Sequence, residues 1–143
     1  MKVSFLCHLL HCLQSTETPD VLYFVLVDRF ANGAYQNDWF VEPQNPQGFH
    51  GGDLQGLTQH LDHIQHLGAD AIWLSPIFQM RTEDFHGHGA FHGYWTENLQ
   101  TISPTVGGEM ALEQLTTEMA NKDMSLILDI VYNHTSFDAP LLN

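Results

Sequence analysis

Three apolar runs rich in strand-forming residues are separated by helical patterns, and this order constrains the fold more than any other feature. The runs occupy residues 21–27, 69–75 and 125–133. They read VLYFVLV, ADAIWLS and SLILDIVYN, so most positions on both faces are apolar. Strands that are buried on both faces are typical of a parallel sheet covered by helices. The sequence therefore predicts an α/β fold.

The two intervening segments have the spacing of amphipathic helices. In residues 54–67, leucine or isoleucine recurs at steps of three and four, ending with Leu67, and Gly68 follows as a stop signal. Residues 109–122 carry a similar stripe, formed by Leu112, Leu115 and Met119. The predicted order is strand, helix, strand, helix, strand, which is the order of consecutive βα units.

Polar, aromatic and acidic residues follow the end of each predicted strand. Residues 28–53 and 81–108 are long polar segments, and Asn133, His134 and Thr135 close the third run. Long connections in compact domains are often functional, and binding sites of parallel α/β folds lie at the carboxyl ends of the strands. We therefore expect a site at this edge of the sheet.

The charge balance excludes some partners. Four Lys and Arg residues stand against 17 Asp and Glu residues, a formal net charge of −13. Binding to nucleic acid needs a basic surface, so neither nucleic acid nor an anionic membrane is an expected partner. No apolar stretch reaches the roughly 18 residues of a membrane span. An acidic chain does suit a hard cation held by oxygen ligands.

The first 19 residues are expected to be a leader or tail, and residues 20–143 the domain. The leader resembles a degenerate signal peptide, interrupted by His8 and His11. Cys7 and Cys12 form no CxxC pair and imply no disulfide framework. Localisation stays open, with a secreted or periplasmic protein favoured over a cytoplasmic one.

Four segments, in order, resemble the α-amylase superfamily of glycoside hydrolases (family 13 type). They are YFVLVDRFANG, GGDLQGLTQHLDHIQHLGADAIWLSPIF, FHGYW and LDIVYNHT, and the resemblance extends over roughly residues 21–138. It implies a (β/α)8 TIM barrel. A complete barrel takes about 250 residues. The expected fold is thus an incomplete barrel, the N-terminal portion with about three βα units.

The resemblance also implies site residues. Tyr94 matches an aromatic residue that stacks on a sugar, His134 a histidine that contacts the same sugar, and Asp129 an acid that supports the site. Asn133 matches a ligand of a structural Ca²⁺ ion. Trp95 is either a further substrate contact or a core aromatic residue. The milder alternative is structural: the aromatic residues fill the core, Asp129 is a buried acid, and the others form a turn.

A second Ca²⁺ site is suggested by the first polar segment. Its candidate ligands are Asn32, Asn37, Asp38, the carbonyl of Gly51, and Asp53. Oxygen ligands on a glycine-rich loop suit calcium. Related proteins often supply another asparagine where this chain has Ala34, so a solvated turn remains the alternative.

Histidines form two further groups. His60, His63 and His66 step by three along a helix, without the i, i+4 pair of a zinc helix, and are expected to be solvated. Asp84, His86, His88 and His92 lie in one loop and could bind a transition metal such as zinc, so a metal-dependent hydrolase is one alternative function.

The favoured function is a glycoside hydrolase or transglycosylase acting on α-1,4-glucans such as starch or maltodextrin, with structural Ca²⁺. Glycoside hydrolysis needs two carboxylates, and the resemblance places these and a third after strands four, five and seven, which lie outside these 143 residues. The chain is therefore expected to be an N-terminal fragment that is inactive and poorly stable alone. The alternative is a non-catalytic remnant that binds sugar or calcium, or nothing. The choice between hydrolysis and transfer, the glucan preferred, and the oligomeric state stay open.

Overall fold

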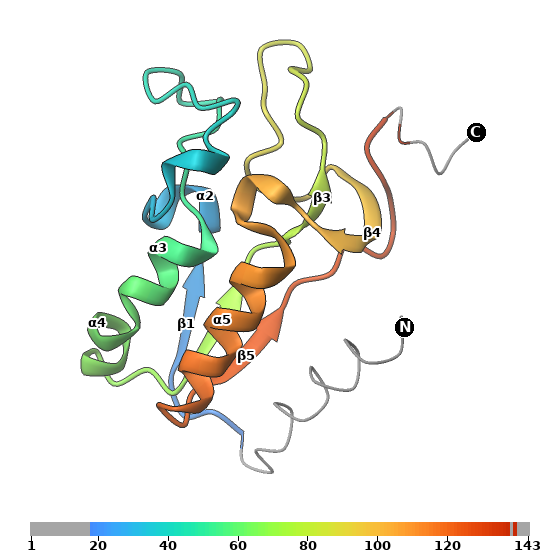
Figure 1. Ribbon diagram of the computed structural model, residues 1–143. Helices are drawn as coiled ribbons and strands as arrows, with labels where there is room; N and C mark the ends of the chain where they lie inside the picture. Colours follow the sequence, from blue (N-terminus) through green and yellow to red (C-terminus); the bar gives the residue numbers. More distant parts are fainter. Residues whose placement is uncertain (1–17, 138, 140–143) are drawn as a thin grey trace.

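A parallel three-stranded sheet forms the centre of the fold (Figure 1). The computed structural model describes residues 18–137 and 139, so most of the expected leader lies outside the described residues. The strands are β1 (Leu22–Val25), β2 (Ala71–Leu74) and β5 (Ser125–Leu128), in the order β1-β2-β5. Both pairs are parallel. The predicted α/β class is confirmed, and the sheet is not closed.

The strands are shorter than predicted. β1 ends at Val25 because the chain turns into the short helix α2 (Val27–Phe30), whose Val27 amide donates to Ser75 Oγ at 3.1 Å. β5 ends at Leu128. The Asp129 amide still donates to the Leu74 carbonyl at 3.3 Å, after which the chain leaves the sheet. The predicted third strand was therefore too long, and Asp129 lies just beyond its end.

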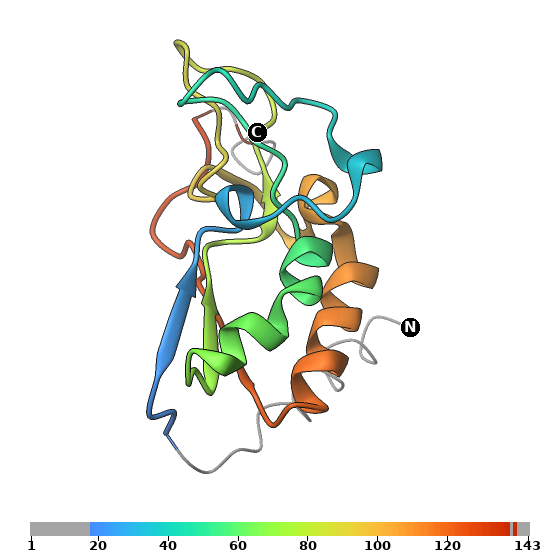
Figure 2. The same cartoon turned by 90° about the vertical axis from the view of Figure 1, so that its left-hand side faces the viewer.

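Helices cover one face of the sheet (Figure 2). The helix predicted over residues 54–67 is divided into α3 (Leu54–Gln59) and α4 (Leu61–His66), with a break at His60, where φ is −111° and ψ is 11°. Leu67 follows α4 and is 57% exposed, so its assignment to the buried stripe was wrong. α5 (Gly108–Ala120) agrees with the second predicted helix.

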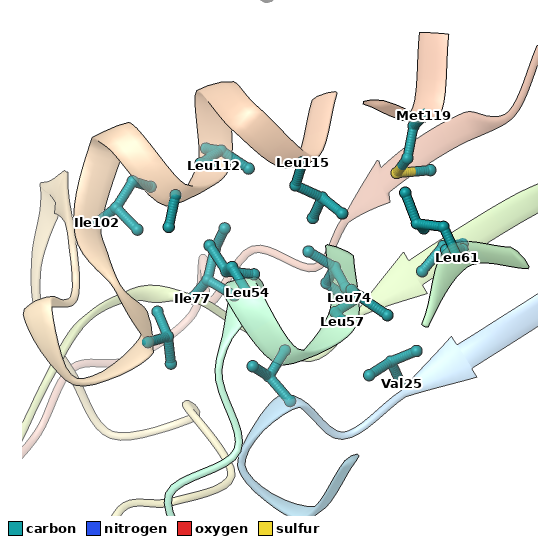
Figure 3. Close-up of a cluster of buried hydrophobic side chains, with 14 of the residues drawn as sticks. Val25, Leu54, Leu57, Leu61, Leu74, Ile77, Ile102, Leu112, Leu115 and Met119 are labelled. Atoms are coloured by element: carbon teal, nitrogen blue, oxygen red, sulfur yellow. The ribbon is translucent and has the colours of Figure 1, made fainter. Parts of the chain in front are cut away.

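The core lies between the sheet and these helices. Figure 3 shows side chains of α3 and α5 meeting those of the strands between the two layers. The predicted leucine and methionine stripes fill it, apart from Leu67. Fully buried members of the core include Val25, Leu54, Leu57, Leu61, Ile64, Ile72, Leu74, Ile77, Leu112, Leu115 and Met119.

The opposite face of the sheet is open. The register aligns Phe24, Trp73 and Ile127 in one row across the three strands. Their exposed fractions are 47%, 37% and 38%, and the Phe24 and Trp73 rings meet edge to face at 5.1 Å. The prediction of apolar residues on both faces is confirmed, but only one face is covered by the described residues.

Part of the second polar segment, which the sequence had suggested to be a loop, belongs to an antiparallel hairpin whose first strand precedes the segment. The hairpin pairs β3 (Phe78–Met80) with β4 (Thr96–Ile102), with register irregularities. The described residues also contain two 3-10 turns, η1 (Tyr35–Asn37) and η2 (Pro104–Val106). No helix in the described part of the chain is long and apolar enough to cross a membrane.

Candidate functional site

Three connections meet beyond the carboxyl ends of the parallel strands. They follow β1, β3 and β5, and they lie together at one end of the sheet in both views (Figures 1 and 2). The expected site residues lie on these connections. The prediction that polar segments gather at this edge is therefore confirmed.

Tyr94, Asp129 and His134 form one cluster. The Tyr94 hydroxyl donates to Asp129 Oδ2 at 2.7 Å, and His134 Nε2 lies 3.1 Å from the Tyr94 carbonyl oxygen. Because an oxygen accepts that second bond, His134 carries its proton on Nε2 there. Tyr94 remains 38% exposed, so its ring is available to a ligand. The structure thus unites three residues from two distant segments.

The local backbone sets the position of Tyr94. Gly93 has φ +82°, and a Cβ at this position would lie 2.0 Å from the Pro76 carbonyl oxygen, so only glycine fits this turn. The Tyr94 amide donates to His92 Nδ1 at 3.0 Å. The His92 and Tyr94 rings stack with centroids 5.8 Å apart and planes inclined by 24°. His92 therefore supports the tyrosine ring from behind.

Tyr94 in this cluster and the adjoining His92 have altered acidity. The hydrogen bond to Asp129, followed by burial and the Asp129 charge, raises the pKa of Tyr94 above its usual value, so the phenol stays protonated and remains a donor. Burial lowers the pKa of His92, because the charged ring is less well solvated. Both shifts favour a neutral aromatic surface.

The position of Trp95 agrees with the core alternative, and its role as a substrate contact stays a prediction. Trp95 is partly buried and packs against the core, and its ring meets His92 edge to face at 5.1 Å. It also lines a cavity of about 220 Å³ next to the cluster. The other lining residues are Arg81, Phe85, His134, Thr135, Ser136 and Phe137. The Ser136 hydroxyl is buried there with no hydrogen-bond partner among the described residues.

Of the five loop residues predicted to bind Ca²⁺, Asn32, Asn37, Asp38 and Asp53 make the hydrogen bonds described next, and Gly51 lies close to Asn32 and Asp38. Asp53 is fully buried and is the N-cap of α3, accepting from the Gly56 amide at 2.6 Å. The same carboxylate accepts from Asn37 Nδ2 at 3.2 Å and from the Ala34 amide at 3.0 Å. Asn32 Nδ2 donates to Asp38 Oδ2 at 2.7 Å.

Two oxygens of these residues are buried without a partner. They are Asn37 Oδ1 and Asp38 Oδ1. A Cβ on Gly51, whose φ is +87°, would lie 2.8 Å from both Asn32 Nδ2 and Asp38 Oδ1, so these groups face the glycine backbone closely. Buried acceptors without donors are costly unless a cation or water satisfies them. The residues present therefore fit a hard cation, although the Asp53 carboxylate already accepts hydrogen bonds from backbone amides.

The other residues predicted as metal ligands, Asn133 and the histidines of the second polar segment, do not form a cluster in the described part of the chain. The Asn133 side chain is exposed on the segment after β5. His86 and His88 are exposed, and His92 supports Tyr94. Over residues 18–137 and 139, no three His, Cys, Asp or Glu side chains are placed to hold a metal ion. The zinc alternative for the histidine loop has no geometric support, while His60, His63 and His66 are exposed as predicted.

Sequence reasoning missed the role of Asp28 and Arg29 in holding the first connection. The buried Asp28 carboxylate accepts from the amides of His50 and Gly51, at 3.0 and 3.2 Å, and pairs with Arg29. Burial raises the pKa of Asp28 despite these bonds. The Arg29 guanidinium also lies 3.7 Å from the centre of the Phe91 ring. Both residues belong to the segment YFVLVDRFANG, which was used only for the family resemblance and gave neither residue a role.

Comparison with known proteins agrees with this geometry. Residues 24–141 match the family model described as "Alpha amylase, catalytic domain". The chain is 36% identical over 133 residues to the periplasmic alpha-amylase of Escherichia coli strain K12, covering 81% of this chain and 19% of that protein. It is 33% identical over 126 residues to a cyclomaltodextrinase of a Bacillus species, covering 84% of this chain and 21% of that one.

Solved structures give the same result. An Anoxybacillus alpha-amylase superposes with a TM-score of 0.79 at 41% identity, covering 86% of this chain and 26% of that one. An alpha-amylase from Geobacillus thermoleovorans, solved in complex with acarbose, gives 0.74 at 39% identity, covering 85% and 25%. The chain thus spans between a fifth and about a quarter of the length of these relatives, and its open sheet matches the N-terminal part of their catalytic barrel.

Proposed function

This chain belongs to the alpha-amylase family, and from that premise we propose that it supplies part of the substrate-binding edge of a glycoside hydrolase or transglycosylase acting on α-1,4-glucans. One observation carries the proposal. The Tyr94 ring is 38% exposed at the carboxyl end of a parallel sheet, where its hydroxyl is bonded to Asp129 and the Tyr94 backbone carbonyl is bonded to His134. A flat ring flanked by polar groups is suited to a sugar, which offers an apolar face and a rim of hydroxyl groups.

In this proposal each residue has a separate task. Tyr94 stacks against a pyranose ring, and His134 hydrogen-bonds a hydroxyl of the same sugar. Asp129 accepts a hydrogen bond from the Tyr94 hydroxyl and so fixes the tilt of the ring. It is a positioning residue, because its Oδ2 is committed to that bond.

The proposal assigns cleavage to other parts of a complete catalytic domain. Glycoside hydrolysis uses two carboxylates that flank the scissile bond. Among the described residues, Asp129 is the one carboxylate bonded to Tyr94 or His134. The same observation favours a second candidate function, a non-catalytic protein that binds sugar.

A structural Ca²⁺ ion is part of the proposal. Asn32, Asn37, Asp38, the Gly51 carbonyl and Asp53 would hold it, and the unpartnered oxygens of Asn37 and Asp38 support this choice. Bound there, the ion would neutralise the acidic loop and fix its path. Asn133 is proposed as a ligand of a separate Ca²⁺ ion, on the family resemblance alone.

A chimera tests the function. Residues 18–139 would replace the matching segment of the E. coli periplasmic alpha-amylase, and starch hydrolysis would be followed by the release of reducing ends. We expect the chimera to hydrolyse starch and its Tyr94→Ala and His134→Ala variants to lose at least about tenfold in kcat/KM. The unfused 143-residue chain should bind maltoheptaose without cleaving it. An inactive but folded chimera that still binds maltoheptaose would favour the non-catalytic candidate.

A further inference from the structure

A second cleft lies between the first connection and the β3–β4 connection. Its volume is about 540 Å³. Its aromatic lining comprises Trp39, Phe40 and Phe49, and its acidic lining includes Glu42, Glu83 and Asp84. The residues of the sugar-binding cluster described above do not line it. The cleft is therefore a separate place on the molecule.

Hydrogen bonds fix the walls of this cleft. The Gly89 amide donates to the Gln47 carbonyl at 2.8 Å, which joins the two connections. The His88 ring nitrogen Nδ1 lies 3.3 Å from Gln47 Oε1. Arg29 donates to the carbonyl oxygens of Pro46 and Gly48, at 3.0 and 2.9 Å. A ligand would therefore meet a formed cleft and would lose little affinity to ordering it.

The lining combines exposed aromatic surface with oriented polar groups. Trp39 is 61% exposed and Phe40 is 45% exposed, although both are large apolar side chains. Asn45 Nδ2 donates to Glu42 Oε2 at 3.0 Å, which fixes a carboxylate and an amide beside the aromatic rings. A carboxylate accepts from hydroxyl groups, and an amide both donates and accepts. This set matches the alternating apolar and hydroxyl surfaces of a sugar.

We propose that the cleft between residues 38–49 and 82–89 is an accessory binding site for a segment of α-glucan, with Trp39 as its stacking platform and Glu42 as its principal hydrogen-bond acceptor. The identity of the ligand rests on the proposed function, whereas the site itself rests on the cleft. Such a site would hold a glucan chain at a second point and raise its local concentration at the Tyr94 cluster. The acidic lining allows one competing ligand, an organic cation held against the aromatic rings.

The experiment removes the first site before testing the second. Maltoheptaose would be titrated by calorimetry into the full 143-residue chain carrying Tyr94→Ala. We expect binding to persist in this variant and to weaken at least about tenfold on adding Trp39→Ala or Glu42→Gln. Tyr35→Ala is the matched control, because Tyr35 is 81% exposed on the same connection but does not line the cleft. Circular dichroism would verify that each variant is folded.

The outcomes separate the two proposals. Loss of all binding in Tyr94→Ala alone would overturn the accessory site and leave the proposed function intact. Residual binding that is unchanged by Trp39→Ala would also overturn it. If the chain bound tetramethylammonium through Trp39 but did not bind maltoheptaose, the ligand of the cleft would be an organic cation and the glucan proposal would be overturned. Binding that is lost in the Trp39→Ala variant and kept in the Tyr35→Ala variant would establish the site.

Discussion

The hydroxyl of Tyr94 donates a 2.7 Å hydrogen bond to Oδ2 of Asp129, across 35 residues of sequence. This bond joins the β3–β4 connection to the residue that follows β5. It therefore orients the exposed aromatic ring relative to the parallel sheet.

Removing the bond and removing the ring should have different effects. Tyr94→Phe keeps the stacking surface and loses the hydrogen bond, so we expect maltoheptaose affinity at this cluster to fall by only a few-fold. Tyr94→Ala also loses the ring and should weaken that binding by roughly tenfold or more, since about 1.4 kcal/mol corresponds to tenfold. Calorimetric titration in the Trp39→Ala background isolates this cluster. Tyr132→Ala is the control, because Tyr132 is 95% exposed on the neighbouring segment and should leave binding unchanged.

The succession of strands and helices along the chain, the helix stripes and the shared edge of the site followed from sequence, because each depends on local periodicity and on a general rule for parallel sheets. Leu112, Leu115 and Met119 illustrate this, since their spacing alone placed them in the core. The β3–β4 hairpin did not follow, because Thr96–Ile102 is mostly polar and has no strand-like run. The bond between Tyr94 and Asp129 depends on how two distant connections approach each other, which no local pattern encodes.

Asp53 should be among the residues whose loss destabilises the fold most. Its buried carboxylate caps α3 and accepts from the amides of Gly33 and Ala34. Asp53→Ala leaves these donors unsatisfied, and we expect the free energy of unfolding to fall by about 2–4 kcal/mol. Urea denaturation would measure it. Glu113→Ala, an exposed change on α5, should stay within about 0.5 kcal/mol of the parent chain, and an equal loss in both variants would contradict the role of Asp53.

Calcium should stabilise the chain through Asp38. A ligand that binds only the folded state raises its stability, so millimolar Ca²⁺ should raise the Tm by several degrees. Asp38→Ala removes the unpartnered Oδ1 and should abolish most of that increase, whatever its effect without calcium. Differential scanning fluorimetry with Ca²⁺ and with EDTA measures this increase in Tm directly. Glu113→Ala, a change of an exposed acid on α5, should keep the full increase in Tm, and a similar reduction in both variants would indicate general charge screening.

The open face of the sheet should govern solubility more than stability. Trp73 and Leu74 are neighbours on β2, but Trp73 is 37% exposed and Leu74 is fully buried. Trp73→Thr should reduce aggregation, measured by light scattering, and lower the free energy of unfolding by only about 1 kcal/mol through the lost Phe24 contact. Leu74→Ala should cost about 2–5 kcal/mol by leaving a cavity. Unchanged aggregation of the Trp73→Thr variant would show that the chain does not aggregate through this face of the sheet.

His92 should make the stability of the fold depend on pH. Burial lowers its pKa in the folded state below the ordinary 6.5, so the unfolded chain binds more protons in the interval between the two values. Stability therefore rises with pH through this interval. The contribution of His92 is complete above about pH 6.5 and is lost as the pH falls through the folded-state pKa. Urea denaturation from about pH 8 down to about pH 5 should show a shallower decline for His92→Gln than for the parent chain. The exposed His63 provides the matched control, and His63→Gln should retain the parental decline. If His92→Gln retained it as well, the acid sensitivity would arise at other groups, and burial of His92 behind the Tyr94 ring would have no thermodynamic consequence.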